Sequence, residues 1–183
     1  MYKRQLDELR ENNNLIKIGT TKRGIGPAYE DKVGRRAIRL CDLFDKEKLN
    51  KKIEILLNHH NAIMRGFGLD EYNLEEVVSE IYKLGEYAKP FAKTINDITN
   101  VINSGKEKIL FEGAQGFLLD IDHGTYPFVT SSNVHASYAS IGSGLNPKVI
   151  NHILAITKAY TTRVGNGPFP TAVSYTHLRA HET

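Results

Sequence analysis

The sequence has no tryptophan, two methionines and a single cysteine, Cys41. One cysteine cannot form a disulfide within the chain, which fits a reducing compartment, and the apolar neighbours of Cys41 predict a small buried thiol rather than a nucleophile. No apolar run approaches the ~20 residues that a membrane helix needs, and the first residues lack the apolar core of a signal peptide. We therefore expect a cytoplasmic protein without a membrane partner.

An excess of one charge is also missing, because 24 Lys and Arg against 21 Asp and Glu leave a net charge of only +3. That charge is too small to indicate a nucleic acid partner, and no aromatic residues alternate with basic ones as in a single-strand binding platform. There is no internal repeat and no Gly-x-x-x-x-Gly-Lys-Ser/Thr loop, and the three Gly-x-Gly pieces do not complete a dinucleotide fingerprint. Length, 40% hydrophobic and 25% charged residues predict a globular domain with a sizeable core.

Apolar residues at helical spacing predict four helices in the first part of the chain, at about 27–40, 45–66, 74–88 and 91–103. Asp45 is the expected N-cap of the second helix, and Pro90 is expected to break the third. The short apolar runs 109–111 and 153–156 predict buried parallel strands. The expected fold class is therefore α/β, with mostly parallel sheet strands, a helical region over about 27–104 and a strand and loop region over about 107–171.

Cations gather at the start of the first expected helix. If residues 27–40 are helical, four of them recur at i, i+3, i+4 and i+7 on one face, namely Lys32, Arg35, Arg36 and Arg39. Like charges at this spacing cost ~0.2–0.5 kcal/mol a pair unless an anion neutralises them. The turn before the helix, residues 20–24, adds hydroxyl groups and the cation of Arg23. These residues form either a solvated charged face or a phosphate or carboxylate site.

Glycines and polar residues follow the first expected strand. Residues 112–116 lie where α/β sheets collect ligands, and Gln115 offers one donor and one acceptor to a base edge, although a plain turn fits equally well. The run 120–123 has two carboxylates and a histidine, but no second ligand cluster stands out, so we expect no metal. The run 130–133 is either a cap and turn or a phosphate-binding loop.

Three long blocks closely resemble signatures of the adenylosuccinate synthetase family, and they occur in the order of that family. They are residues 19–32, GTTKRGIGPAYEDK; residues 111–133, which begin FEGAQG and end DIDHGTYPFVTSSN; and residues 158–171, KAYTTRVGNGPFPT. The resemblance covers about 6–171 and implies the central part of a longer synthetase with a partly P-loop-NTPase-like fold. Residues 1–5 and 172–183 are then an expected non-native leader and tail.

The resemblance implies a ligase of purine and AMP biosynthesis that forms adenylosuccinate from IMP and L-aspartate. In the family, GTP phosphorylates the 6-oxygen of IMP with the help of Mg²⁺, and the amino group of aspartate then displaces phosphate. The family's general base, general acid and nucleotide loop match segments upstream of this chain, and its aspartate and guanine sites match segments downstream. We therefore expect no catalytic or metal-binding residue here and no ligase activity from this chain alone.

Several positions match IMP-binding residues of the family. Thr21 and Thr130 match residues that bind the 5′-phosphate, Gln115 a glutamine near the 6-oxygen, and Val164 a backbone contact to the ribose. Arg35 matches an arginine that reaches the phosphate of the neighbouring subunit's IMP, which implies a homodimer. Supporting residues on the same basis are Arg23, Lys32, Arg39 and Asp122.

The sequence departs from the family pattern in two places, with Phe117 for a frequent threonine and Ser137 and Tyr138, preceded by His135, where a glycine pair is common. These departures leave the local backbone geometry open. The basic residues and glycine-rich turns also permit an alternative function, a stand-alone nucleotide- or phosphate-binding module without ligase activity.

Overall fold

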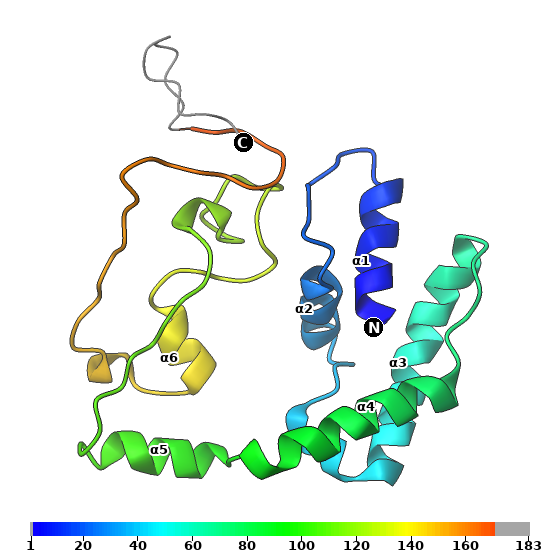
Figure 1. The fold of residues 1–183 in the computed structure, drawn as a ribbon, viewed down its shortest axis with the longest axis horizontal. Coiled ribbons are helices and arrows are strands. Elements are labelled where there is room, and N and C mark those ends of the chain that lie inside the picture. The colour runs from blue at the N-terminus through cyan, green and yellow to red at the C-terminus, as the bar shows by residue number, and fades with distance from the viewer. Residues whose placement is uncertain (1, 171–183) are drawn as a thin grey trace. The chain divides into compact units, whose positions relative to one another are not determined.

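The computed structural model describes residues 2–170 of the chain. Over these residues it contains six α-helices and four short 3-10 helices (Figure 1). In chain order they are α1 (Tyr2–Asn13), α2 (Ile25–Val33), η1 (Leu40–Phe44), α3 (Lys46–Gly66), α4 (Leu74–Ala88), η2 (Lys89–Phe91), α5 (Ile95–Asn103), η3 (Phe117–Leu119), α6 (Tyr138–Ser143) and η4 (Pro147–Val149). The expected tail at 172–183 lies outside the described residues.

The chain divides into two units, each of which is described by itself. Among the described residues, unit 1 contains Lys3–Gly26 and 110–170, and unit 2 contains Tyr2 and Pro27–Ile109. No helix within residues 2–170 is both long and apolar enough to cross a membrane.

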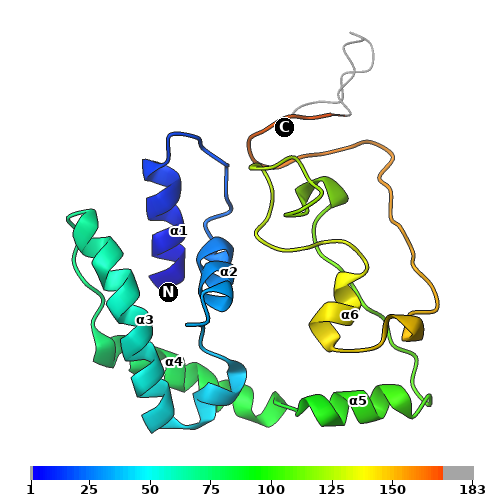
Figure 2. The same cartoon turned by 180° about the vertical axis from the view of Figure 1, so that it is seen from behind.

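Helix α3 forms the centre of unit 2. Its N-cap is Asp45, as predicted, and the carboxylate of this residue accepts a hydrogen bond from the N–H of Lys48 at 3.0 Å. Its buried apolar residues keep helical spacing and are Leu49, Ile53, Leu56, Leu57 and Met64. Burying each such side chain contributes about 1.5–3 kcal/mol. Helix α4 lies beside α3 in both views (Figures 1 and 2).

Helix α4 has the predicted bounds, and Asn73 caps it by accepting from the N–H of Glu76 at 3.1 Å. It buries Val77 and Val78, whereas Leu84 is 58% exposed. Pro90 ends the helix in the short turn η2, because proline has no N–H to donate. The next helix, α5, therefore begins at Ile95 rather than 91.

Helix α2 is shorter than the predicted helix over 27–40, because it ends at Val33. The N–H of Arg36 donates to the carbonyl of Asp31 at 3.0 Å, and the N–H of Arg35 donates to that of Lys32 at 3.1 Å. These two bonds form a Schellman motif, which terminates a helix with a left-handed residue. Because Arg35 has a φ of +60°, the expected four-cation helical face is wrong.

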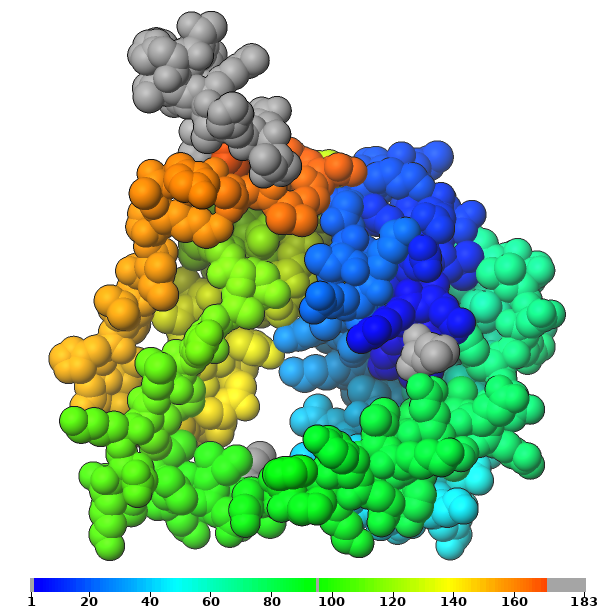
Figure 3. All heavy atoms as spheres, in the orientation of Figure 1, coloured from blue at the N-terminus to red at the C-terminus, as the bar shows by residue number. Residues whose placement is uncertain are grey.

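The expected α/β fold is also wrong for this chain, since residues 2–170 contain no β-strand. The segments 109–111 and 153–156 are not helical, and Leu110 and Leu154 are 86% and 87% exposed. Figure 3 shows the second segment, in orange, on the surface of unit 1. A strand needs a neighbouring backbone for its hydrogen bonds, and neither segment has such a ladder here. Cys41, expected to be buried, is exposed in η1.

Candidate functional site

The first and third sequence blocks meet in unit 1 at Gly19 and Gly165. The N–H of Asn166 donates to the carbonyl of Ile18 at 3.1 Å, and its side-chain amide donates to that of Lys17 at 3.0 Å. A Cβ at Gly19 would lie 2.6 Å from the backbone nitrogen of Asn166. Only a glycine fits here, because Gly19 also has a φ of +76°.

The second and third blocks are joined through Arg163. Its guanidinium donates to the hydroxyl of Thr125 at 3.0 Å and to the carbonyl of Phe128 at 2.7 Å. A side chain at Gly167 would collide with Phe128, since an added Cβ lies 2.5 Å from the Phe128 Cβ. Val164 follows Arg163 directly, and its own side chain is 82% exposed.

The loop 19–24 is fastened to α1 by carboxylates. Glu11 accepts from the N–H of Gly19 at 2.6 Å, and Asp7 accepts from the N–H of Gly24 at 2.9 Å. Thr21 lies exposed between these two anchors. The loop continues into Gly26, whose added Cβ would lie 3.5 Å from the hydroxyl of Ser131, so the first block also contacts the second.

A buried carboxylate, that of Asp120, organises the second block. Its two oxygens accept backbone hydrogen bonds at 2.6–3.3 Å from Asp122, His123, Val134 and His135. Burial opposes ionisation, but these four bonds outweigh it and lower the pKa of Asp120 to about 2. The loop that Asp120 closes carries Thr130, which is half-buried and donates its N–H to the carbonyl of Leu119 at 2.9 Å.

The run 120–123 is therefore a turn built around a structural carboxylate. Both Asp120 oxygens already face N–H groups, and Asp122 accepts from the side-chain amide of Asn133 at 2.5 Å. Among residues 2–170, no group of three His, Cys, Asp or Glu is arranged to hold a metal ion. Sequence reasoning missed the organising role of Asp120, although an aspartate that begins a turn is a known acceptor for the N–H groups after it.

The structure distributes the candidate residues over the two units. Unit 1 holds Thr21, Arg23, Gln115, Asp122, Thr130 and Val164. Unit 2 holds Lys32, Arg35 and Arg39, all three exposed. Arg39 lies beyond α2, and its N–H donates to the buried carboxylate of Asp42 at 2.9 Å. Arg35, whose predicted target is another subunit, is thus the only one of the five matched IMP residues in unit 2.

Strained backbone conformations occur at or beside several of the candidate IMP residues. Lys22, Arg35 and Gln115 are the non-glycine residues with positive φ within 2–170, at +53°, +60° and +63°. A left-handed conformation costs a residue with a Cβ about 1 kcal/mol or more, and such strain gathers at functional sites. Two of the three are candidate IMP residues, and the third lies between Thr21 and Arg23. The sequence offers no signal for this strain, because glycine usually occupies such positions.

Two comparisons bear on this framework. A family model for adenylosuccinate synthetase matches residues 1–182. A solved structure of fully ligated adenylosuccinate synthetase from Plasmodium falciparum matches with a TM-score of 0.84 and 34% sequence identity. That match covers 95% of this chain and 41% of that chain, so this chain spans less than half the length of the solved relative.

The fold of the described residues is therefore similar to that of part of a solved synthetase. The chain belongs to the adenylosuccinate synthetase family, because the family model matches nearly all of its residues. The family resemblance seen in the three sequence blocks is thereby confirmed.

Proposed function

We propose that the protein containing this chain is a GTP-dependent ligase that joins IMP to L-aspartate and forms adenylosuccinate, GDP and phosphate. In this proposal the chain supplies walls of the IMP pocket. The observation that carries the proposal is the junction of the three family blocks in unit 1, where Asn166, Arg163 and Gly26 connect the loops of Thr21, Thr130 and Val164.

The hydroxyls of Thr21 and Thr130 bind the 5′-phosphate of IMP. The loop of Thr21 is fixed at both ends by α1, and that of Thr130 is closed by the buried Asp120 carboxylate. Because both loops are held before the ligand arrives, binding does not have to order them. Arg23, exposed beside Thr21, adds a positive charge that favours the phosphate.

The base and the ribose are bound by Gln115 and Val164. The amide of Gln115 offers a donor and an acceptor to the base near its 6-oxygen, and the residue is exposed, with the left-handed backbone that such strained binding positions adopt. The backbone of Val164 contacts the ribose, and Arg163 and Gly165 fix this backbone on either side. Asp122 supports the phosphate loop through its bond to Asn133.

Arg35 serves the site of a neighbouring subunit, so the active protein is a homodimer. Its guanidinium binds the 5′-phosphate of the partner's IMP, while Lys32 and Arg39 raise the local positive potential. A guanidinium–phosphate contact is among the stronger charge-assisted hydrogen bonds in proteins. The proposal places the protein in the cytoplasm.

Mg²⁺ and GTP would activate the 6-oxygen of IMP in this reaction, but the described residues do not form a site for the metal ion. The carboxylate of Asp120 is occupied by four backbone N–H groups, and the described part of the chain has no three-residue metal cluster. The residues of this chain bind and orient IMP, and none is assigned a catalytic role. The groups that hold Mg²⁺, GTP and L-aspartate are proposed to come from other segments of the complete protein.

Replacing Thr130 by alanine tests the proposal. A hydrogen bond to a charged group contributes about 1.5–3 kcal/mol, so the complete protein with Thr130→Ala is expected to bind IMP about 10- to 150-fold more weakly. Its affinity for inosine, which lacks the phosphate, should not change. Isothermal titration calorimetry measures both affinities.

The matched control is Thr99→Ala, which removes a half-buried threonine from α5. This variant is expected to bind IMP like the unmodified protein. Unchanged IMP binding in Thr130→Ala would contradict the assigned phosphate site. IMP binding without any adenylosuccinate formation by the complete protein would instead favour the stand-alone binding module.

A further inference from the structure

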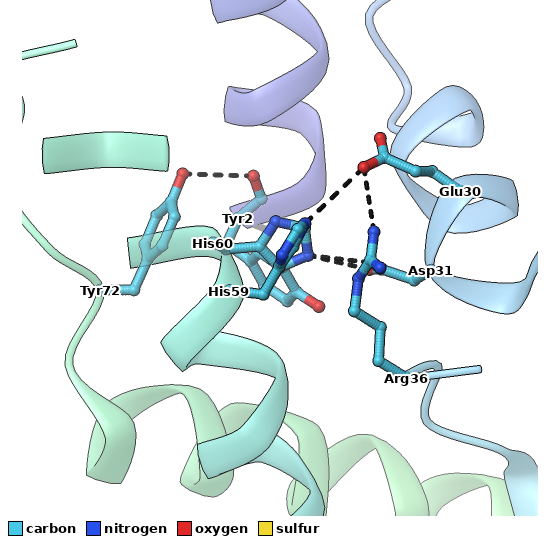
Figure 4. A network of polar contacts seen from close by, with 7 residues as sticks. All are labelled: Tyr2, Glu30, Asp31, Arg36, His59, His60 and Tyr72. Atoms are coloured by element: carbon cyan, nitrogen blue, oxygen red, sulfur yellow. Dashed lines mark hydrogen bonds and ion pairs between the residues drawn. The ribbon is translucent and has the colours of Figure 1, made fainter. Parts of the chain in front are cut away.

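We propose that His60 is a positioning residue that fixes Arg35 for its contact with the IMP phosphate. This role of His60 rests on the proposed function of Arg35. His60 lies in α3, whereas Arg35 follows α2. Figure 4 shows the network, in which His60 of α3, Asp31 of α2 and Arg36 after α2 meet.

The link between α3 and α2 is a buried histidine–carboxylate pair. His60 and Asp31 are both fully buried, and Nε2 of His60 lies 3.1 Å and 3.0 Å from the two carboxylate oxygens. The other ring nitrogen, Nδ1, has no hydrogen-bond partner within the described structure. A proton on Nε2 therefore lets His60 donate to the Asp31 carboxylate.

Aromatic rings enclose this pair. The ring of Tyr2 lies 5.7 Å from that of His60 and 5.6 Å from that of Tyr72, measured between centroids. Burial, followed by the negative charge of Asp31, raises the pKa of the Tyr2 hydroxyl. Glu30 faces the same region and lies 3.8 Å from Nε2 of His59. Because water is kept from the pair, its hydrogen bonds hold Asp31 in one orientation.

Asp31 in turn clamps the segment that carries Arg35. Its main-chain carbonyl accepts from the N–H of Arg36 at 3.0 Å, and its carboxylate accepts from Nε of the same residue at 2.7 Å. The guanidinium of Arg36 also donates to Glu30 at 3.0 Å and crosses Gly34, where any Cβ would collide with it. Gly34 and Arg35 are thus enclosed between two residues that are bonded to each other twice.

This clamp holds Arg35 in its strained conformation. The φ of +60° costs energy for a residue with a Cβ, so Arg35 leaves it when the surrounding bonds loosen. Arg36 is committed to the network, whereas the side chain of Arg35 is exposed. If only a fraction of molecules presents Arg35 correctly, the apparent affinity for the phosphate falls by that fraction. His60 therefore acts on IMP binding through Asp31 and the backbone of Arg35.

The experiment is a double-mutant cycle on the complete protein, with IMP and inosine as ligands. His60→Leu removes the hydrogen bond to Asp31 and is expected to weaken IMP binding about three- to tenfold without changing inosine binding. In an Arg35→Ala background, His60→Leu should have no further effect. His60→Gln keeps a donor near the Nε2 position and should restore IMP affinity to within about twofold of the unmodified protein.

The matched control is Asn58→Leu, which places the same leucine at an exposed position of α3 two residues away. It should leave both affinities unchanged. If His60→Leu does not fold, Arg36→Met opens the clamp from its other side and should give the same pattern. Calorimetric titration supplies the affinities, and thermal unfolding shows which variants are folded.

Equal weakening of IMP and inosine binding by His60→Leu would overturn the inference. The inference would also be overturned if His60→Leu weakened IMP binding as much in the Arg35→Ala background as in the unmodified protein. If Arg35→Ala weakens IMP binding and His60→Leu does not, the role of His60 is overturned while that of Arg35 stands. Unchanged IMP binding in Arg35→Ala would instead refute the proposed role of Arg35 itself. The two failures are therefore distinguishable.

Discussion

Arg35 occupies a position where a helix usually ends in glycine. The Schellman motif at the end of α2 requires a left-handed residue, and the glycine that would meet this need, Gly34, stands one position earlier. An arginine at the strained position lowers the stability of the chain. In our account, the binding energy that Arg35 gains from a phosphate explains why the cost is tolerated.

Arg35→Gly should therefore raise the free energy of unfolding by up to about 1 kcal/mol, because glycine adopts a positive φ without strain. The control is Arg39→Gly, since Arg39 has a φ of −98° and glycine there should lower stability by about 0.5–1 kcal/mol. Urea denaturation of both variants makes the comparison. A loss of stability in Arg35→Gly as large as that in Arg39→Gly would show that the backbone at Arg35 is not strained.

Among the elements, the loop closed by Asp120 determines the shape of the second block. Its carboxylate has a pKa near 2 in the folded chain, below the ordinary value of 3.8. A lowered folded-state pKa contributes stability above the unfolded pKa, and this contribution is lost as the pH falls from about 4 to about 2. The loop should therefore open over that interval.

Asp120→Asn should open the loop at neutral pH and remove this part of the pH dependence. An asparagine amide would direct a donor at backbone N–H groups, so at least one carboxylate bond is lost. Hydrogen exchange at the N–H of Val134, followed from pH 7 downward, measures the opening. Asp70→Asn, at an exposed position outside this loop, is the control and should exchange like the unmodified chain. Slow exchange in Asp120→Asn would contradict the role of Asp120.

The elements that local sequence determines were predicted well. Helices α3 and α4 follow from apolar spacing and from their N-caps, of which Asp45 was predicted and Asn73 was not. Each cap lies directly before the helix that it begins. The end of α2 was missed, because it depends on a contact between Arg36 and Asp31, although Gly34 was a usable stop signal. The two predicted strands were wrong because a strand is defined by its neighbour rather than by its own residues.

The IMP-binding roles of the candidate residues stay predictions that rest on the family resemblance, whereas the connections between their loops come from the structure. Family resemblance supplied Thr21, Gln115 and Thr130, and the loops of Thr21 and Thr130 are joined through Gly26. No periodicity or spacing announced Asp120 or His60, since each acts on partners at least a dozen residues away as well as on its neighbours. Long-range hydrogen bonds of this kind become visible only when the chain is folded.

For the whole molecule, the central claim is that two copies of the chain share each IMP site. Thr130 is proposed to bind the phosphate in its own subunit, and Arg35 to reach the phosphate held by its partner. Each site of a homodimer then needs one residue from each copy. A subunit with Arg35 replaced and one with Thr130 replaced can therefore compensate for each other.

The most direct measurement is adenylosuccinate formation by a mixture of the two complete variant proteins, Arg35→Ala and Thr130→Ala, at limiting IMP. Half of the randomly exchanged dimers pair one variant with the other, and one of their two sites carries both native residues, so the mixture should recover about a quarter of the unmodified activity. Each variant alone should stay well below that value. A mixture no more active than the average of its two components would contradict a shared site.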